Sequence, residues 1–157
     1  MSDVERIRGD LSSIAKEARG LDWSDKRPWT TATHVFWEAS VPTVDLHDLN
    51  AKLAKGAVLA ACQHEPETGA IFFITGRGRR SVGPGVLGGV VKSELKHLCR
   101  GKTWSFRPAG PGKYVLITDR SKAPGSATGA LGPLFWLFVA VLLAGLAAVV
   151  WNNFPAP

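Results

Sequence analysis

The residues best suited to chemistry lie in one short basic segment, Thr75–Gly89, which reads TGRGRRSVGPGVLGG. It follows a run of apolar residues typical of a strand and precedes a helical pattern. Glycine lets backbone N–H groups approach a ligand, a helix N-terminus favours negative charge, and guanidinium groups bind phosphate. The segment is therefore a candidate anion- or phosphate-binding site. Its candidate residues are Arg77, Arg79, Arg80, Gly83 and Gly85.

Within this segment, Arg80–Gly85 (RSVGPG) resembles the R-x-x-G-x-G pyrophosphate loop of the acetyl-CoA-dependent N-acyltransferase superfamily (GNAT), which also joins a strand to a helix. The resemblance covers at most Ala57–Phe106, and it implies an acyltransferase that holds the pyrophosphate of acyl-CoA with Arg80, Gly83 and Gly85. Two features depart from the family: Pro84 removes a backbone donor, and TWSFRP runs almost directly into KYVLITD without the expected helix between them. A basic surface loop that meets lipid phosphates is the alternative.

Two pairs of possible metal ligands form a second, weaker candidate. Cys62 and His64 make a C-x-H pair, and His97 and Cys99 make an H-x-C pair. Four such ligands would suit tetrahedral zinc. Buried cysteines and surface histidines are the commoner explanation, so we expect no metal and no other cofactor.

Aromatic and basic residues alternate in WSDKRPW (Trp23–Trp29) and RGKTWSFR (Arg100–Arg107), a pattern that can stack bases and hold phosphates. Nucleic-acid binding is therefore a further alternative. The sequence lacks G-x-S-x-G and every other complete nucleophile motif, which argues against an enzyme of that kind.

The elements that must position these residues follow from hydrophobic spacing and turn signals. We expect an amphipathic helix over 3–19, a strand over 34–41 that ends at Pro42, and a short helix capped by Asp45 or Asp48 that ends near Gly56. A hairpin of strands 57–63 and 70–76, a helix over 90–99, and strands 103–108 and 113–119 complete the domain. This order predicts an α+β fold, with a small mixed or antiparallel sheet and helices on one face, a ferredoxin-like arrangement being one candidate.

The last part of the chain predicts a membrane anchor. Residues 130–151 carry no charge, and at about 1.5 Å per residue they span roughly 33 Å, close to the hydrocarbon core of about 30 Å. Cations flank only the N-terminal side, which places residues 1–122 in the cytosol. We therefore expect a single-pass, tail-anchored protein with a flexible linker at 123–129 and a translocated tail at 152–157. Small residues recur at Ala140, Ala144 and Ala148, a pattern that lets two such helices approach closely, although alanine is also common in any membrane anchor.

Charge and cysteine content narrow the function. The formal net charge is +6, and every charged side chain lies at or before Lys122. Two cysteines are too few for a secreted disulfide framework and suit a reducing cytosol. A basic domain tethered to a bilayer suits anionic lipid headgroups, a protein partner or a second copy of itself. The sequence predicts a binding or adaptor module at the membrane surface, with the acyltransferase and the membrane-tethered nucleic-acid-binding protein as alternatives.

Overall fold

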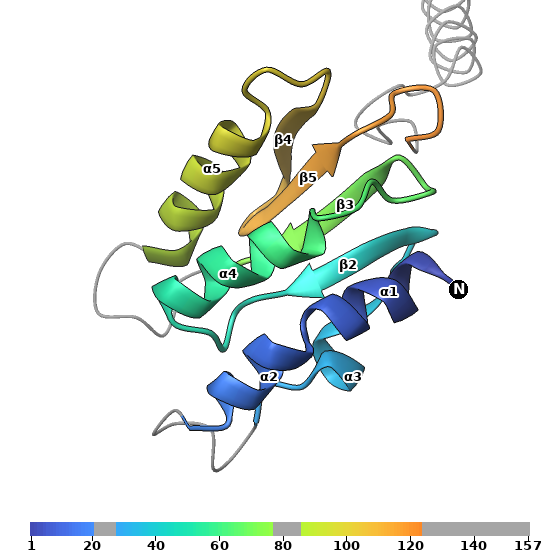
Figure 1. Ribbon diagram of the computed structural model, residues 1–157. Coiled ribbons are helices and arrows are strands. Elements are labelled where there is room, and N and C mark those ends of the chain that lie inside the picture. The colour runs from blue at the N-terminus through green and yellow to red at the C-terminus, as the bar shows by residue number, and fades with distance from the viewer. Residues whose placement is uncertain (21–27, 77–85, 124–157) are drawn as a thin grey trace, which may run out of the picture. The chain divides into compact units, whose positions relative to one another are not determined.

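The computed structural model describes residues 1–20, 28–76 and 86–123 (Figure 1). Residues Met1–Pro124 form one compact unit. Its strands are β1 (Val35–Glu38), β2 (Val41–Asp45), β3 (Ala70–Ile74), β4 (Ser105–Gly110) and β5 (Lys113–Ile117). Its helices are α1 (Asp3–Asp10), α2 (Ser12–Ala18), α3 (Thr31–His34), α4 (Ala51–Ala61) and α5 (Val86–Leu98). The predicted α+β class with a mixed sheet is confirmed.

The five-stranded sheet has the order β1-β2-β3-β5-β4. β2 and β3 are parallel neighbours, and every other neighbouring pair is antiparallel. A ferredoxin-like sheet inserts a strand between the two strands that its crossover helix joins, whereas here α4 joins β2 to β3 and these two strands pair directly. The ferredoxin-like arrangement was therefore a wrong expectation.

The main hydrophobic core lies between one face of the sheet and the helices, which gather on that face in Figure 1. Alternate strand residues point into it, because successive side chains of a strand face opposite sides. The strand residues of this core include Val35, Val44, Ile71, Phe73 and Leu116. A smaller apolar cluster on the other face is built around Val41, Ala70 and Val115.

Residues 57–61 form the second half of α4, so the predicted hairpin of 57–63 with 70–76 is wrong in its first strand. The helix begins at the N-cap Asn50, whose side-chain oxygen accepts from the Leu53 N–H at 2.9 Å, and neither Asp45 nor Asp48 caps it. Gly56 does not end the helix. A Cβ at this position would lie 3.1 Å from Ile14 Cδ1, so glycine allows α2 and α4 to approach closely.

Residues 34–41 do not form one strand ended by Pro42. The chain turns back at Ala39 and Ser40, which both have positive φ (48° and 63°), and β1 and β2 form a hairpin across this turn. Pro42 pairs with Trp37 within β2. It precedes Thr43–Asp45, the part of β2 that pairs with β3, so its missing N–H breaks no hydrogen bond of that ladder.

The predicted N-terminal helix is confirmed as two short helices that break at Leu11. Its apolar stripe is buried, including Val4, Ile7, Leu11 and Ala18. Asp3 ties the start of α1 to the connection before β3: its carboxylate accepts from the backbone N–H groups of Glu67 (3.0 Å) and Thr68 (3.2 Å), and it also pairs with Arg6.

The predicted span 130–151 and its flanks from residue 124 onward lie outside the described residues. Within the described ranges, no helix is both long and apolar enough to cross a bilayer.

Replacing the buried Asp3 by alanine is expected to lower the free energy of unfolding by about 3 kcal/mol, because two backbone N–H groups and Arg6 lose their acceptor. Urea unfolding of residues 1–124, followed by circular dichroism, measures this change. Asp10→Ala, at the other end of the same helix, is the control and should change the value by less than about 0.5 kcal/mol. Equal losses in both variants would contradict this role of Asp3.

Candidate functional site

The candidate site lies at the edge of the sheet where β2 and β3 end. Because the two strands are parallel, their carboxyl ends meet there: Asp45 pairs with Ile74, and the Leu46 N–H donates to the Ile74 carbonyl at 2.8 Å. The residues that follow β2 and those that follow β3 therefore lie close together. Ligands of open α/β sheets commonly bind outside the carboxyl ends of parallel strands.

His47 stands at this edge between two carboxylates. Its Nδ1 lies 2.6 Å from Asp45 Oδ1, and its Nε2 lies 2.9 Å from Asp48 Oδ2. The same Asp45 oxygen also accepts from the His47 backbone N–H at 3.1 Å, which fixes the short turn after β2. The side chain of His47 is 45% exposed, so its ring remains accessible to solvent.

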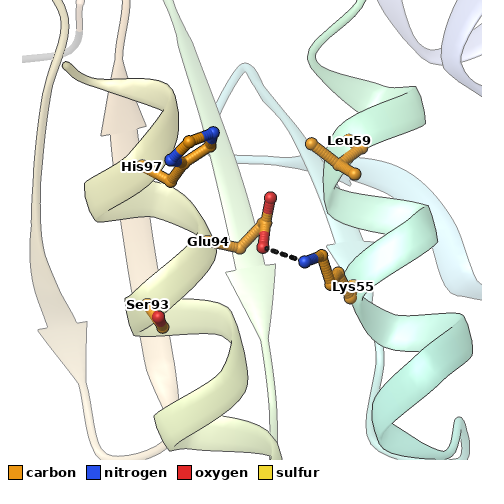
Figure 2. A pocket seen from close by; sticks show the side chains of 5 residues that line it. All are labelled: Lys55, Leu59, Ser93, Glu94 and His97. Carbon is orange, nitrogen blue, oxygen red and sulfur yellow. Dashed lines mark ion pairs between the residues drawn. The ribbon is translucent and has the colours of Figure 1, made fainter.

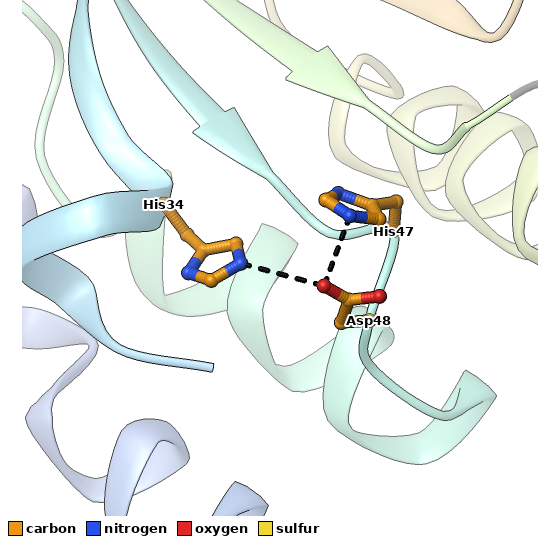
Figure 3. Close-up of side chains that lie close together, drawn as sticks. All are labelled: His34, His47 and Asp48. Carbon is orange, nitrogen blue, oxygen red and sulfur yellow. Dashed lines mark ion pairs between the residues drawn. The ribbon is translucent and has the colours of Figure 1, made fainter. Parts of the chain in front are cut away.

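His34 approaches the same carboxylate from α3. Its Nε2 lies 3.7 Å from Asp48 Oδ2, and Figure 3 shows Asp48 between the two histidine rings. The Nδ1 of His34 faces its own helical turn, 2.8 Å from Thr33 Oγ1 and 3.1 Å from the Thr30 carbonyl. Unlike His47, His34 is buried, with a side chain that is 11% exposed.

Trp29 connects His34 of α3 to the end of β2. Its indole Nε1 donates to the Asp45 carbonyl at 2.7 Å, and its ring stacks on His34 with the centroids 5.3 Å apart. The ring is almost fully buried, which makes this contact part of the core. The segment before α3 is thereby fixed against the end of β2.

Gly76 brings the chain from β3 onto His47. Its φ is +75°, and a Cβ here would lie 3.2 Å from His47 Cβ. Only glycine adopts this backbone conformation without strain, and only glycine avoids the contact. The basic segment predicted from the sequence therefore begins beside the histidine cluster.

The predicted anion-site residues lie outside the described residues. They are Arg77, Arg79, Arg80, Gly83 and Gly85. The two ends of their segment are described: it leaves β3 after Gly76 and enters α5 at Val86, so the expected strand-to-helix connection is confirmed.

The four weaker metal-ligand candidates occupy the far ends of α4 and α5. Cys62 is buried at the end of α4, and burial raises the pKa of its thiol to about 12, which disfavours the thiolate that zinc binds. Burial also raises the pKa of the Cys99 thiol. His64 and His97 are exposed. In the described part of the chain, the group of three or more potential ligands close together is His34, His47 and Asp48, and it includes none of these four residues.

His97 instead lines an open pocket between α4 and α5, together with Lys55, Leu59, Ser93 and Glu94 (Figure 2). An ion pair of 3.3 Å between Lys55 and Glu94 crosses this pocket. It joins the two helices and neutralises the largely buried Glu94 carboxylate. This pocket is explained by packing of the helices.

Two of the tryptophans proposed for base stacking are buried in the core. Trp29 stacks on His34 and donates to the Asp45 carbonyl, and Trp104 donates to Glu65 Oε1 at 3.1 Å. Lys102 also covers the Trp104 ring, at 3.6 Å from its centroid. Neither indole presents a free face to a base.

Sequence reasoning missed the histidine cluster, although a signal was present. Asp45-Leu46-His47-Asp48 follows directly after the β-branched run Val41–Val44, which places two carboxylates and a histidine at a strand end. Pro42 obscures this signal, because a proline in an apolar run usually marks the end of a strand. Comparisons with protein-family models, curated proteins and solved structures found no match. The chemistry of these side chains therefore carries the functional argument.

Two glycine variants separate backbone strain from contact with His47. Gly76 and Gly101 have nearly the same φ (+75° and +73°), but a Cβ at Gly101 would meet nothing within 4 Å. Alanine at either position should cost about 1–2 kcal/mol of stability. Only Gly76→Ala should also displace the His47 ring, which the NMR signals of the histidine rings would report. An unchanged His47 signal in Gly76→Ala would contradict the close contact.

Proposed function

We propose that this chain is a tail-anchored membrane protein whose cytosolic domain is a binding module for a phosphate-bearing ligand. One observation carries the binding part: the arginine- and glycine-rich segment follows β3 at Gly76, where a Cβ would lie 3.2 Å from His47 Cβ, at the carboxyl edge of β2 and β3. Arg77, Arg79 and Arg80 follow Gly76 in the sequence, and ligands commonly bind beyond the carboxyl ends of parallel strands. The anchor rests on the uncharged run 130–151.

Both ring nitrogens of His47 lie near carboxylates, which orient the imidazole at this edge. Guanidinium groups supply strong bidentate contacts to phosphate oxygens. The ligand is therefore recognised through its phosphates, with His47 at the rim of the site.

A nucleic acid is a second candidate for the ligand, in place of the anionic headgroups of the bilayer. β5 runs antiparallel to β3, so Ile117 pairs with Ala70 at the start of β3, and the Thr118 N–H donates to the Gly69 carbonyl at 2.9 Å. The described domain thus ends at the edge opposite the candidate site, roughly 13 Å away along β3. A soluble phosphate-bearing ligand is therefore tested beside the lipid headgroups.

Replacing Arg77, Arg79 and Arg80 together by alanine is expected to weaken phosphate-ligand binding at least tenfold, because three guanidinium contacts are lost. Fluorescence anisotropy of a single-stranded oligonucleotide over a range of salt concentrations measures this loss. For a nucleic acid, the slope of log K against log salt should fall by about 2. The control removes three exposed cations elsewhere (Lys16, Lys96 and Arg100), which changes the net charge equally.

Parallel titrations distinguish the sources of phosphate. Binding to vesicles rich in phosphatidylserine, without binding to the oligonucleotide, would assign the site to lipid headgroups. A response to coenzyme A that disappears in Arg80→Ala would favour the acyltransferase that the segment resembles. If both triple variants bind every probe like the unaltered chain, the phosphate site is refuted.

Deleting residues 130–157 is expected to release the protein from membranes, because the deletion removes the uncharged run. Sedimentation of cell membranes after a wash in high salt measures the bound fraction. The control deletes only residues 152–157 and should remain bound. A chain without 130–157 that still sediments with washed membranes would contradict the single anchor.

A further inference from the structure

We propose that His34, His47 and Asp48 bind a divalent transition-metal ion, zinc being the ion that this set of ligands suits best. Imidazole nitrogen and carboxylate oxygen are both zinc ligands, and three protein ligands with one open position are typical of zinc sites that keep a water. This inference goes beyond the phosphate-binding function and does not depend on the arginine-rich segment.

The positions of the three ligand atoms fit a single ion. All lie within 4.8 Å of one another. Ligands about 2.0–2.1 Å from zinc at the corners of a tetrahedron lie about 3.3 Å apart. The two distances to Asp48 Oδ2, 2.9 Å from His47 Nε2 and 3.7 Å from His34 Nε2, lie on either side of that value. Small side-chain shifts would place all three around one ion.

The second nitrogen of each histidine already has a partner that suits metal binding. Metal-bound histidines usually donate their other ring N–H to a carboxylate or a carbonyl, which selects the tautomer and orients the ring. Asp45 offers this acceptor to His47 Nδ1 at 2.6 Å. The Thr30 carbonyl (3.1 Å) and Thr33 Oγ1 (2.8 Å) offer it to His34 Nδ1. The Thr30 N–H, 3.2 Å from the same nitrogen, would suit the opposite tautomer, so an ion at Nε2 selects between the two.

The scaffold holds these ligands in place before an ion arrives. His34 is stacked on Trp29, and Trp29 donates to the Asp45 carbonyl, so both histidines are fixed to the end of β2. His47 is half exposed and Asp48 is 32% exposed, so the ion can reach the site from solvent. Three protein ligands would leave the fourth position of a tetrahedral ion to a water or to an anionic ligand.

The same geometry would also fit a metal-free bridge in which His47 alone joins Asp45 and Asp48. The metal site and the metal-free bridge give His34 different roles. His34 is a ligand of the ion in the first and takes no part in the second. The two explanations differ also in stoichiometry, because only a metal site takes up one ion per chain. Both differences are measurable on the full chain.

The experiment uses the full chain, purified without a polyhistidine tag, and competes it for Zn²⁺ against a chromophoric chelator. The unaltered protein should bind one ion. His47→Ala and Asp48→Asn should each weaken binding at least tenfold, and Asp45→Asn should weaken it about 10–100-fold through the orientation of His47. The matched control is the double variant His64→Ala/His97→Ala, which removes the other two of the four histidines and should bind like the unaltered chain.

Two further measurements do not depend on the folding of variants. In the unaltered protein, Zn²⁺ should shift the ring signals of His34 and His47 and leave those of His64 and His97 in place. Co²⁺ should give the visible absorption of a four-coordinate ion without a thiolate-to-metal charge-transfer band.

The proposal is overturned if the protein takes up no Zn²⁺, if the His64→Ala/His97→Ala variant loses binding, or if a thiolate band appears. It is also overturned if only His47 responds and His34 does not. None of these results bears on the arginine variants, so the phosphate site stands or fails separately.

Discussion

The parallel pairing of β2 with β3 is the constraint on which the rest of this structure depends. Parallel neighbours cannot be joined by a tight turn, so the chain must cross over one face of the sheet, and α4 makes that crossing. The crossover gives the other helices a surface to pack against and fixes the helical layer on one face. It also brings two carboxyl ends to one edge, where Asp45 and Gly76 meet around His47.

Much of the outer framework was predictable from local sequence patterns. The spacing of Val4, Ile7 and Leu11 predicts the N-terminal helices, and the run Ala70–Ile74 predicts β3. α4 was half missed because periodicity alone does not separate a buried helix from a buried strand in a short apolar run such as 57–63. Gly56 resembles a stop signal in the sequence, and its actual role depends on Ile14, a contact that no local pattern reveals.

The site was less predictable than the fold, for a different reason. The turn between β1 and β2 uses Ala39 and Ser40 in the left-handed region, where Asn and Gly would have signalled a hairpin. A prediction that misses this turn also misses β2. Without β2, no sequence pattern indicates that His47 lies beside His34. The arginine-rich segment was recognisable from composition alone, but the position of Gly76 beside His47 depends on the parallel pairing. Chemistry that depends on residues from separate elements emerges only once the sheet order is known.

The tie between Asp3 and Thr68 has a consequence for handling this protein. Thr68 adjoins Gly69, and a Cβ on Gly69 would lie 2.6 Å from the Asp119 carbonyl, so the first helix and the last described residues meet at the same edge of the sheet. That edge is the one away from His47. A fluorescent reporter fused before Met1 would therefore leave the histidine edge unobstructed.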